Sequence, residues 1–323
     1  MCAIFGLLDF GSNLTPARRL DIICKLGRAA EVRGTDATGI AYVQDGTIRI
    51  QKAPRPARRM HYRIAPQARA IMGHTRMTTQ GSEKKNYNNH PFSGRAGKHS
   101  FALAHNGVLF NDTLLRQIHG LPPTIIETDS YVAVQLLERQ GRLDARSLGV
   151  MAEALDGSFT ITVLDEKGSL YLVKGDNPLT LLHFPTLGAY LYASTQEILD
   201  RALMELGLIG LSRETIPVEQ GDILKIDAGG ERTLSCFDDT NLCLRHYSQY
   251  SLWLDCCPPV WHGEKADSYM EEVIEYGIRQ GIPERDLRLL VDAGYDAFDM
   301  EELLYDPALR QSCVEEIRCG PYR

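Results

Sequence analysis

The sequence MCAIFG at residues 1–6 places a cysteine directly after the initiator methionine. Removal of Met1 would leave Cys2 with a free α-amine beside its own thiol. A thiol with a pKa of about 8.5 and an α-amine with a pKa of about 7.7–8.0 both titrate near neutrality, so the amine can accept the thiol proton. Residues 3–8 form an apolar run typical of a buried strand, which would hold Cys2 at its end. Taken alone, Cys2 is better interpreted as a small hydrophobic residue at a chain end.

The composition is that of an ordinary globular protein. With 323 residues, 44% of them hydrophobic, the chain can form one large domain with an appendage or two domains. It has no run of about eighteen apolar residues and no basic N-terminal region, so we expect no membrane span, no signal peptide and a cytoplasmic location. The eight cysteines form no CxxC pair, which favours reduced thiols. Cys256 and Cys257, with His262 nearby, lack the usual spacing of metal ligands, so no metal site is expected.

Charge is distributed unevenly along the chain. Residues 264–323 contain 15 acidic and 7 basic side chains, so this segment accounts for the whole net charge of −7 and leaves residues 1–263 close to neutral. A nearly neutral body offers no broad basic surface for nucleic acid. The run RPARRMHYR at residues 55–63 is locally basic, and we interpret it first as a solvated loop and second as a contact for an anionic ligand or a partner.

Local patterns predict antiparallel sheets with helices interspersed. Thr15 followed by Pro16 is typical of a helix start, and apolar residues continue from there at helical spacing. Two apolar segments flank Asp45-Gly46, which is a strong signal for a β-hairpin. Further strands are expected at residues 70–77, 101–110, 159–164, 169–173, 179–183, 189–193, 221–227 and 232–237, and further helices at residues 130–139, 148–155 and 195–206.

Three segments in the first 130 residues concentrate functional groups. Arg76, at the end of an expected strand, can bind a carboxylate with two hydrogen bonds, and the carboxylate of Asp129 can hold an ammonium group. The side chain of Asn106 and the N–H of the following glycine can stabilise an oxyanion. Together these groups predict a binding site for an amino acid. The three segments are GHTRMTTQG at residues 73–81, AHNG at 104–107 and ETD at 127–129.

Six motifs follow one another in the N-terminal half of the chain: Cys2, RGTDATG at residues 33–39, GHTRMTTQG at 73–81, Asn89-His90-Pro91, His105-Asn106-Gly107 and Glu127-Thr128-Asp129. In this order they resemble the motifs of class II glutamine amidotransferase domains, which are N-terminal-nucleophile (Ntn) hydrolases. The chain is similar to the glutaminase halves of glucosamine-6-phosphate synthase and of phosphoribosylpyrophosphate amidotransferase. The resemblance implies an α+β fold, a four-layer αββα sandwich of two antiparallel sheets. It also implies an enzyme that hydrolyses glutamine to glutamate and ammonia. No cofactor is expected.

The resemblance also implies a role for each residue that matches a family motif. Cys2 would be the nucleophile and its α-amine the base, while Asn106 and Gly107 would form the oxyanion hole. Arg76 would bind the α-carboxylate of glutamine and Asp129 its α-ammonium. Further roles would fall to Thr79 as a substrate contact, to Arg33 beside the nucleophile, and to His105 as a supporting residue.

Met77 and Gln80 depart from the family pattern. The synthase relatives carry an aromatic residue at the first position and a histidine at the second. Both positions lie in the loop that closes over glutamine in the family. The departures therefore bear on loop closure and on any ammonia channel, rather than on the hydrolysis itself.

The resemblance ends near residue 240. We expect a glutaminase domain at residues 1–240, a linker or strap at 241–263, and an acidic, mostly helical extension at 264–323. About 80 residues are too few for the second domain of the named relatives, so an acceptor enzyme would be a separate subunit. Helices in the extension are expected at residues 266–279, 282–292, 300–304 and 307–318.

Several of these residues have a structural alternative. Arg76 and Asp129 could form a buried ion pair. His74 and His105 are better interpreted as hydrogen-bonded core histidines than as catalysts, because the terminal amine already supplies the base. The segment at residues 88–90 is as consistent with the end of a loop as with a site.

Three functions stay open at this point. The chain could be a glutaminase subunit that passes ammonia to an acceptor enzyme, a free-standing amidohydrolase of glutamine or another γ-amide, or a regulatory or scaffold protein that retains the fold. The intact set of Cys2, Arg76, Asn106 and Asp129 argues against the third. The oligomeric state and the pathway are left open.

Overall fold

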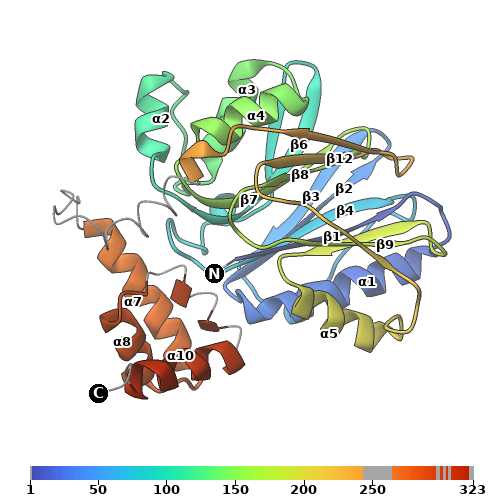
Figure 1. The fold of residues 1–323 in the computed structure, drawn as a ribbon. Coiled ribbons are helices and arrows are strands. Elements are labelled where there is room, and N and C mark those ends of the chain that lie inside the picture. The colour runs from blue at the N-terminus through green and yellow to red at the C-terminus, as the bar shows by residue number, and fades with distance from the viewer. Residues whose placement is uncertain (1, 243–263, 296–298, 301–302, 305–306, 320–323) are drawn as a thin grey trace. The chain divides into compact units, whose positions relative to one another are not determined.

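The computed structural model divides into two units, Cys2–Trp253 and Leu254–Arg323. The linker predicted at residues 241–263 lies almost entirely outside the described residues, and the predicted domain boundaries stay a prediction. The structure describes residues 2–242, 264–295, 299–300, 303–304 and 307–319 (Figure 1).

Two antiparallel sheets form the first unit (Figure 1). The seven strands of the first sheet lie in the order β11 (Glu214–Ile216), β9 (Thr180–Phe184), β10 (Ala189–Ala193), β1 (Ala3–Asp9), β4 (Ala70–Arg76), β2 (Ala37–Gln44) and β3 (Thr47–Ala53). The six strands of the second lie in the order β13 (Arg232–Cys236), β12 (Asp222–Ile226), β8 (Leu170–Lys174), β7 (Gly157–Asp165), β6 (His99–Leu109) and β5 (Phe92–Ala96).

Helices cover the outer face of each sheet. Helices α1 (Pro16–Ala29) and α5 (Gln196–Leu206) pack together against the first sheet, and α3 (Tyr131–Gln140) and α4 (Ala145–Ala154) pack against the second (Figure 1). A short helix, α2 (Asp112–Ile118), follows β6.

Three hydrophobic cores result from this layering. Phe5 and Ile22 belong to the core between the first sheet and its helices. Phe159 belongs to the corresponding core of the second sheet. Ile4 and Leu172 belong to a third core that neither helix layer contributes to, so it lies between the sheets. The arrangement is a four-layer αββα sandwich, and the predicted fold class is confirmed.

Local signals in the sequence account for the elements that begin this unit. The Thr15 hydroxyl accepts a hydrogen bond from the Arg18 backbone N–H at 3.2 Å, which caps α1 as expected. Asp45 and Gly46 have φ angles of 49° and 69° and close the hairpin between β2 and β3, as a two-residue turn requires. All seven residues of β1 are buried because both faces of this central strand are covered.

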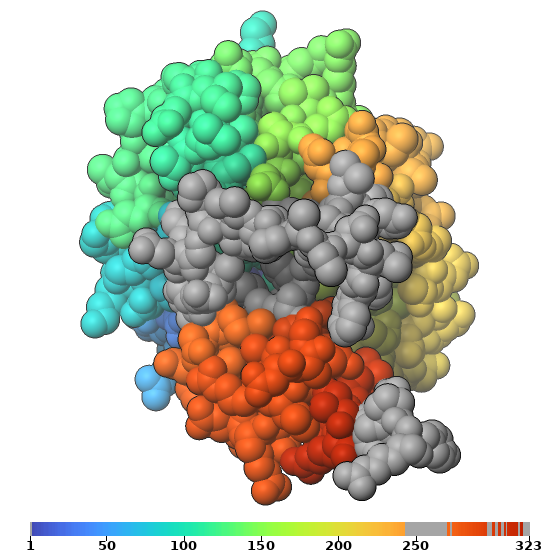
Figure 2. Space-filling model, turned by 60° about the vertical axis from the view of Figure 1, so that its left-hand side comes forward, coloured from blue at the N-terminus to red at the C-terminus, as the bar shows by residue number. Residues whose placement is uncertain are grey.

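The second unit is helical in its described residues. They form α7 (Glu264–Arg279), α8 (Glu284–Asp292) and α10 (Pro307–Cys319), which agrees with three of the four predicted helices. The fourth, at residues 300–304, lies partly outside the described residues. Helix α8 packs against both α7 and α10. Figure 2 shows the surface of this unit in orange to red. No helix among the residues that the structure describes combines the length and apolar character required to cross a membrane.

Candidate active site

Cys2 lies at the start of β1, in the centre of the first sheet. Ala3 pairs with Thr75 of β4, and Arg76 of β4 pairs in turn with Ala37 of β2. Continuing this register by one residue places Cys2 beside Arg76 at the end of β4. Three buried strands therefore bring the predicted nucleophile and the predicted carboxylate-binding arginine to one edge of the sheet.

The half-buried Cys2 side chain contacts the loop that follows β4. Its thiol donates to the carbonyl oxygen of Met77 at 3.5 Å. Arg33 Nε donates to the carbonyl oxygen of Cys2 at 2.8 Å and fixes the backbone at this point. Burial raises the pKa of the Cys2 thiol above its usual value. The thiol is therefore protonated at neutral pH, and a base has to remove its proton before the sulfur can attack.

Asn106 supplies an unpaired amide donor from strand β6. Its side-chain Nδ2 is buried and has no hydrogen-bond partner among the described residues. Its backbone carbonyl accepts a hydrogen bond from Asn177 Nδ2 at 3.1 Å, which holds the residue in place. Because leaving a buried donor unpaired costs about 1–3 kcal/mol, nearly all such groups in folded proteins have a partner. The Asn106 amide is thus available to an acceptor atom of a bound ligand.

A hydrogen bond between the two sheets fixes the position of Asn106. His74 Nε2 of β4 donates to the carbonyl oxygen of His105 at 3.0 Å. His74 and Arg76 are two residues apart on a strand, so their side chains leave the same face of the sheet. The bond therefore holds the neighbour of Asn106 against the end of β4 that carries Arg76 and lies next to Cys2.

Gly107, the residue after Asn106, occupies a position that admits only glycine. Its φ angle is +142°, and a Cβ atom there would lie 1.9 Å from the carbonyl oxygen of Ser158 on the neighbouring strand. Any side chain would push β6 away from β7 and displace Asn106 with it.

Arg76 and Asp129 are both buried, at 2% exposure each, and they have separate partners. Arg76 donates to Asn89 Oδ1 at 2.7 Å and to the carbonyl oxygens of two residues in its own loop. Asp129 accepts from the Leu109 backbone N–H at 2.7 Å and from the Ser130 hydroxyl at 3.2 Å. The described residues show no ion pair between Arg76 and Asp129. The two side chains are therefore held by separate hydrogen bonds and not by each other.

Both charges lie within electrostatic range of the thiol. After burial, which has the largest effect, Arg76 lowers the pKa of Cys2 and Asp129 raises it. The charges of Arg76 and Asp129 therefore both act on the Cys2 thiol. Arg33 contacts the Cys2 backbone, and the backbone of His105 is hydrogen-bonded to His74 of β4. Thr79 lies half-buried in the loop after β4.

Sequence reasoning assigned no role to two residues that organise this loop. Asp36 accepts from the Thr78 backbone N–H at 2.7 Å, and its place inside the RGTDATG motif is the signal that could have identified it. Lys52 of β3 donates to the carbonyl oxygens of Asn89 and Pro91, the latter at 3.1 Å. No sequence motif marks Lys52. Asn89, left open between a loop and a site, is the side-chain partner of Arg76.

Three buried histidines lie next to this loop. The rings of His74 and His90 are 4.2 Å apart, and His105 Nδ1 is 2.8 Å from the Ser130 hydroxyl. Burial lowers the pKa of each histidine, that of His74 to about 3. All three are therefore neutral at physiological pH. The hydrogen bonds of His74 and His105 agree with their interpretation as core histidines.

The described residues contain no group of three or more His, Cys, Asp or Glu side chains that could hold a metal ion. Cys256, Cys257 and His262, which we considered for this role, lie outside the described residues.

No family model matches the chain. Among individual proteins, the chain is 32% identical over 189 residues to the glutamine–fructose-6-phosphate aminotransferase (isomerizing) of Staphylococcus epidermidis, covering 55% of this chain and 30% of the relative. It is 28% identical over 195 residues to the enzyme of the same name from Corynebacterium efficiens, covering 56% of this chain and 31% of the relative. The chain thus spans less than a third of the length of these curated relatives.

Solved structures share the fold. The glutamine phosphoribosylpyrophosphate amidotransferase of B. subtilis, in complex with ADP and GMP, superimposes with a TM-score of 0.58 at 22% identity over 73% of this chain and 49% of that chain. At this identity the likeness shows the fold alone. Together with the sequence relatives, it confirms the resemblance of this chain to class II glutamine amidotransferase domains.

Proposed function

We propose that this chain, which carries a class II glutamine amidotransferase domain, hydrolyses the side-chain amide of glutamine through Cys2 and releases ammonia for an acceptor on another subunit. One observation carries the proposal. The buried Nδ2 of Asn106 has no partner among the described residues, and it lies at the end of the sandwich where Cys2 and Arg76 meet. A fixed donor without a partner can stabilise a negative charge that develops on oxygen only during a reaction.

The first half of the reaction forms a thioester. Once Met1 is removed, the α-amine of Cys2 accepts the thiol proton, and the sulfur attacks the amide carbon of glutamine. The electron pair of the C=O bond moves to oxygen, where Asn106 Nδ2–H and the backbone N–H of Gly107 stabilise the negative charge. The C–N bond then breaks, the proton held by the amine passes to the leaving nitrogen, and ammonia departs.

The second half regenerates the enzyme. The same amine, now neutral, takes a proton from water, and the hydroxide attacks the thioester carbon. Collapse of this second oxyanion breaks the C–S bond, releases glutamate and returns the proton to the sulfur. The neutral histidines nearby are not needed as bases, because a single amine serves both steps.

Arg76 and Asp129 would hold the amino-acid end of glutamine. A guanidinium group can accept a carboxylate with two parallel hydrogen bonds, and a buried carboxylate can pair with an ammonium. In the structure the guanidinium of Arg76 donates instead to Asn89 and to two loop carbonyls. Binding of glutamine would exchange some of these bonds for bonds to its carboxylate, with little change in the number of bonds made.

The experiment that tests the proposal measures ammonia and glutamate released from glutamine by the purified chain. We expect equal amounts of the two products, active protein that begins at Cys2 by intact mass, and no activity in Cys2→Ala. The matched control is Cys236→Ala, at an exposed cysteine on β13, which should leave the rate unchanged.

Two results would refute the proposal. The first is full activity in protein whose mass still includes Met1. The second is a Cys2→Ala variant that folds and retains activity. Hydrolysis of another γ-amide in preference to glutamine would instead identify a different amidohydrolase.

A further inference from the structure

A long stretch of the chain around β3 carries only positive charge. Between Asp45 and Glu83 the sequence contains seven arginines and one lysine but no acidic residue. The run at residues 55–63 belongs to this stretch and, unlike Arg76 near the end of the stretch, takes no part in the proposed glutamine hydrolysis. Such an imbalance suits an anionic ligand, provided that the cations converge on a site.

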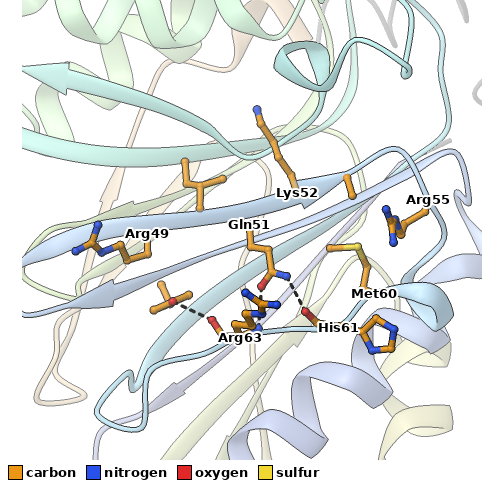
Figure 3. A pocket seen from close by; sticks show the side chains of 10 residues that line it. Arg49, Gln51, Lys52, Arg55, Met60, His61 and Arg63 are labelled. Carbon is orange, nitrogen blue, oxygen red and sulfur yellow. Dashed lines mark hydrogen bonds between the residues drawn. The ribbon is translucent and has the colours of Figure 1, made fainter.

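The structure brings part of this stretch together into a pocket of about 480 Å³ at the edge of the first sheet (Figure 3). Strand β3 forms one wall, and the segment at residues 60–63 forms another. The side chain of Gln51 ties the walls together, because its Nε2 donates to the His61 carbonyl at 2.7 Å and its Oε1 accepts from the Arg63 N–H at 2.8 Å. The Tyr42 hydroxyl donates to the Arg63 carbonyl at 2.9 Å. These hydrogen bonds fix the two walls relative to each other, and the pocket has the size of a small-molecule site.

Three arginines line the pocket without a counter-charge. The guanidinium groups of Arg49, Arg55 and Arg63 are exposed and make no ion pair or hydrogen bond with the described residues, and no acidic residue lines the pocket. Arg58, in the same run but not among the lining residues, pairs with Glu31. Figure 3 shows the guanidinium of Arg49 directed away from the other labelled side chains, so Arg55 and Arg63 are the unpaired charges on which the site depends.

Lys52 contributes to the wall but not to the charge that faces the pocket. Figure 3 shows its amine directed away from the other labelled side chains. The amine donates to the carbonyl oxygens of Asn89 and Pro91 instead. Recognition in the pocket therefore depends on arginines, whose planar groups bind phosphate oxygens with two hydrogen bonds.

We propose that this pocket binds a small phosphate-bearing molecule with at least two negative charges. The site goes beyond the proposed hydrolysis of glutamine and does not depend on it. A small ligand suits the pocket better than a nucleic acid strand, because the one tyrosine, tryptophan or phenylalanine in its lining, Tyr42, is 8% exposed, which leaves the His61 imidazole as the single exposed ring for stacking on bases.

The test is calorimetric titration of the full-length chain with pyrophosphate and, separately, with ribose 5-phosphate, at low ionic strength. The two probes distinguish a diphosphate from a phosphate monoester as the bound group. We expect one site per chain. Arg55→Gln and Arg63→Gln each remove a charged, bidentate contact between arginine and phosphate, so each should weaken binding about 10-fold or more.

The matched control is Arg146→Gln. Arg146 is an exposed arginine of α4 outside the pocket, and its replacement changes the net charge by the same amount. It should bind both probes as the wild type does, and thermal melting should show that all three variants fold.

Three results would overturn the proposal. One is that neither pyrophosphate nor ribose 5-phosphate binds at millimolar concentration. Another is an equal loss of affinity in Arg146→Gln, which would indicate a general charge effect. The third is tighter binding of a short single-stranded oligonucleotide than of either probe, with that binding weakened by Arg63→Gln.

Discussion

Asn106 is the residue on which the proposed chemistry depends most directly. Its unpaired Nδ2 stabilises an oxyanion more than it stabilises the carbonyl of bound glutamine, because charge accumulates on oxygen only as the sulfur attacks. We expect Asn106→Ala to lower kcat by about 10²–10³-fold and to change KM little. Steady-state kinetics of glutamine hydrolysis provides the measurement.

The control for this variant is Asn13→Ala, at an exposed asparagine before α1. Circular dichroism establishes that both variants fold. A glutamine-like affinity label should still alkylate Cys2 in Asn106→Ala, because Arg76 and Asp129 are untouched. Near-normal kcat in a folded Asn106→Ala variant would contradict the assignment.

Sequence motifs identify groups that carry chemistry better than groups that position them. The cysteine after Met1, the His-Asn-Gly segment and the arginine in GHTRMTTQG are all recognisable from the chain. The bond between Arg76 and Asn89 joins residues 13 positions apart across a loop, and no periodicity predicts it. The same holds for Lys52, which reaches this loop from the second strand of the hairpin, because the turn signal at Asp45-Gly46 predicts only the hairpin.

Among the elements, the central strands and the capped helices were the predictable ones. An apolar run predicts strand β1, and the Asp45-Gly46 turn predicts the β2–β3 hairpin. The Thr15 cap predicts the start of α1. Strands β5 and β11 and helix α2, which have five, three and seven residues, were not predicted from the sequence. β5 and β11 are edge strands, so each pairs on one side only, and such short segments give little periodic signal.

Strand β3 holds the loop after β4 through Lys52, and pH should reveal this contact. Burial lowers the pKa of Lys52 to about 8, with a smaller effect from Arg76, whereas the pKa in the unfolded chain is about 10.4. Between these values the unfolded chain binds a proton that the native chain has lost, so the stability of the wild type rises with pH. The lysine therefore destabilises the native state most below about pH 8, where it is charged while half-buried.

We expect the free energy of unfolding of the wild type to rise relative to that of Lys52→Met by about 1–2 kcal/mol between pH 8 and pH 9.5. Urea denaturation of both proteins at several pH values measures this difference, in which the titration of the other groups cancels. The control is Lys98→Met, at an exposed lysine in the turn between β5 and β6. A difference that does not change with pH would show that Lys52 is not a buried titrating group.

In the whole molecule, the hydrophobic cores and the candidate site lie within the same part of the chain. The buried residues of the three cores begin at Ala3 and end at Leu242, and none comes from the described residues of the second unit. The residues proposed to act on glutamine lie between Cys2 and Asp129. The first unit therefore has the attributes of an independently folding domain.

This organisation predicts that a chain ending at residue 263 folds and hydrolyses glutamine with the kcat/KM of the full-length protein. Removing α7, α8 and α10 deletes an acidic segment with its own internal packing and leaves all three cores of the sandwich intact. Thermal melting and the glutamine assay on both chains provide the measurement, and Cys2→Ala in the shortened chain is the negative control. A shortened chain that fails to fold would show that the predicted domain boundary is wrong. One that folds but loses activity would show that the acidic helices take part in glutamine hydrolysis, which the positions of Cys2, Arg76, Asn106 and Asp129 do not require.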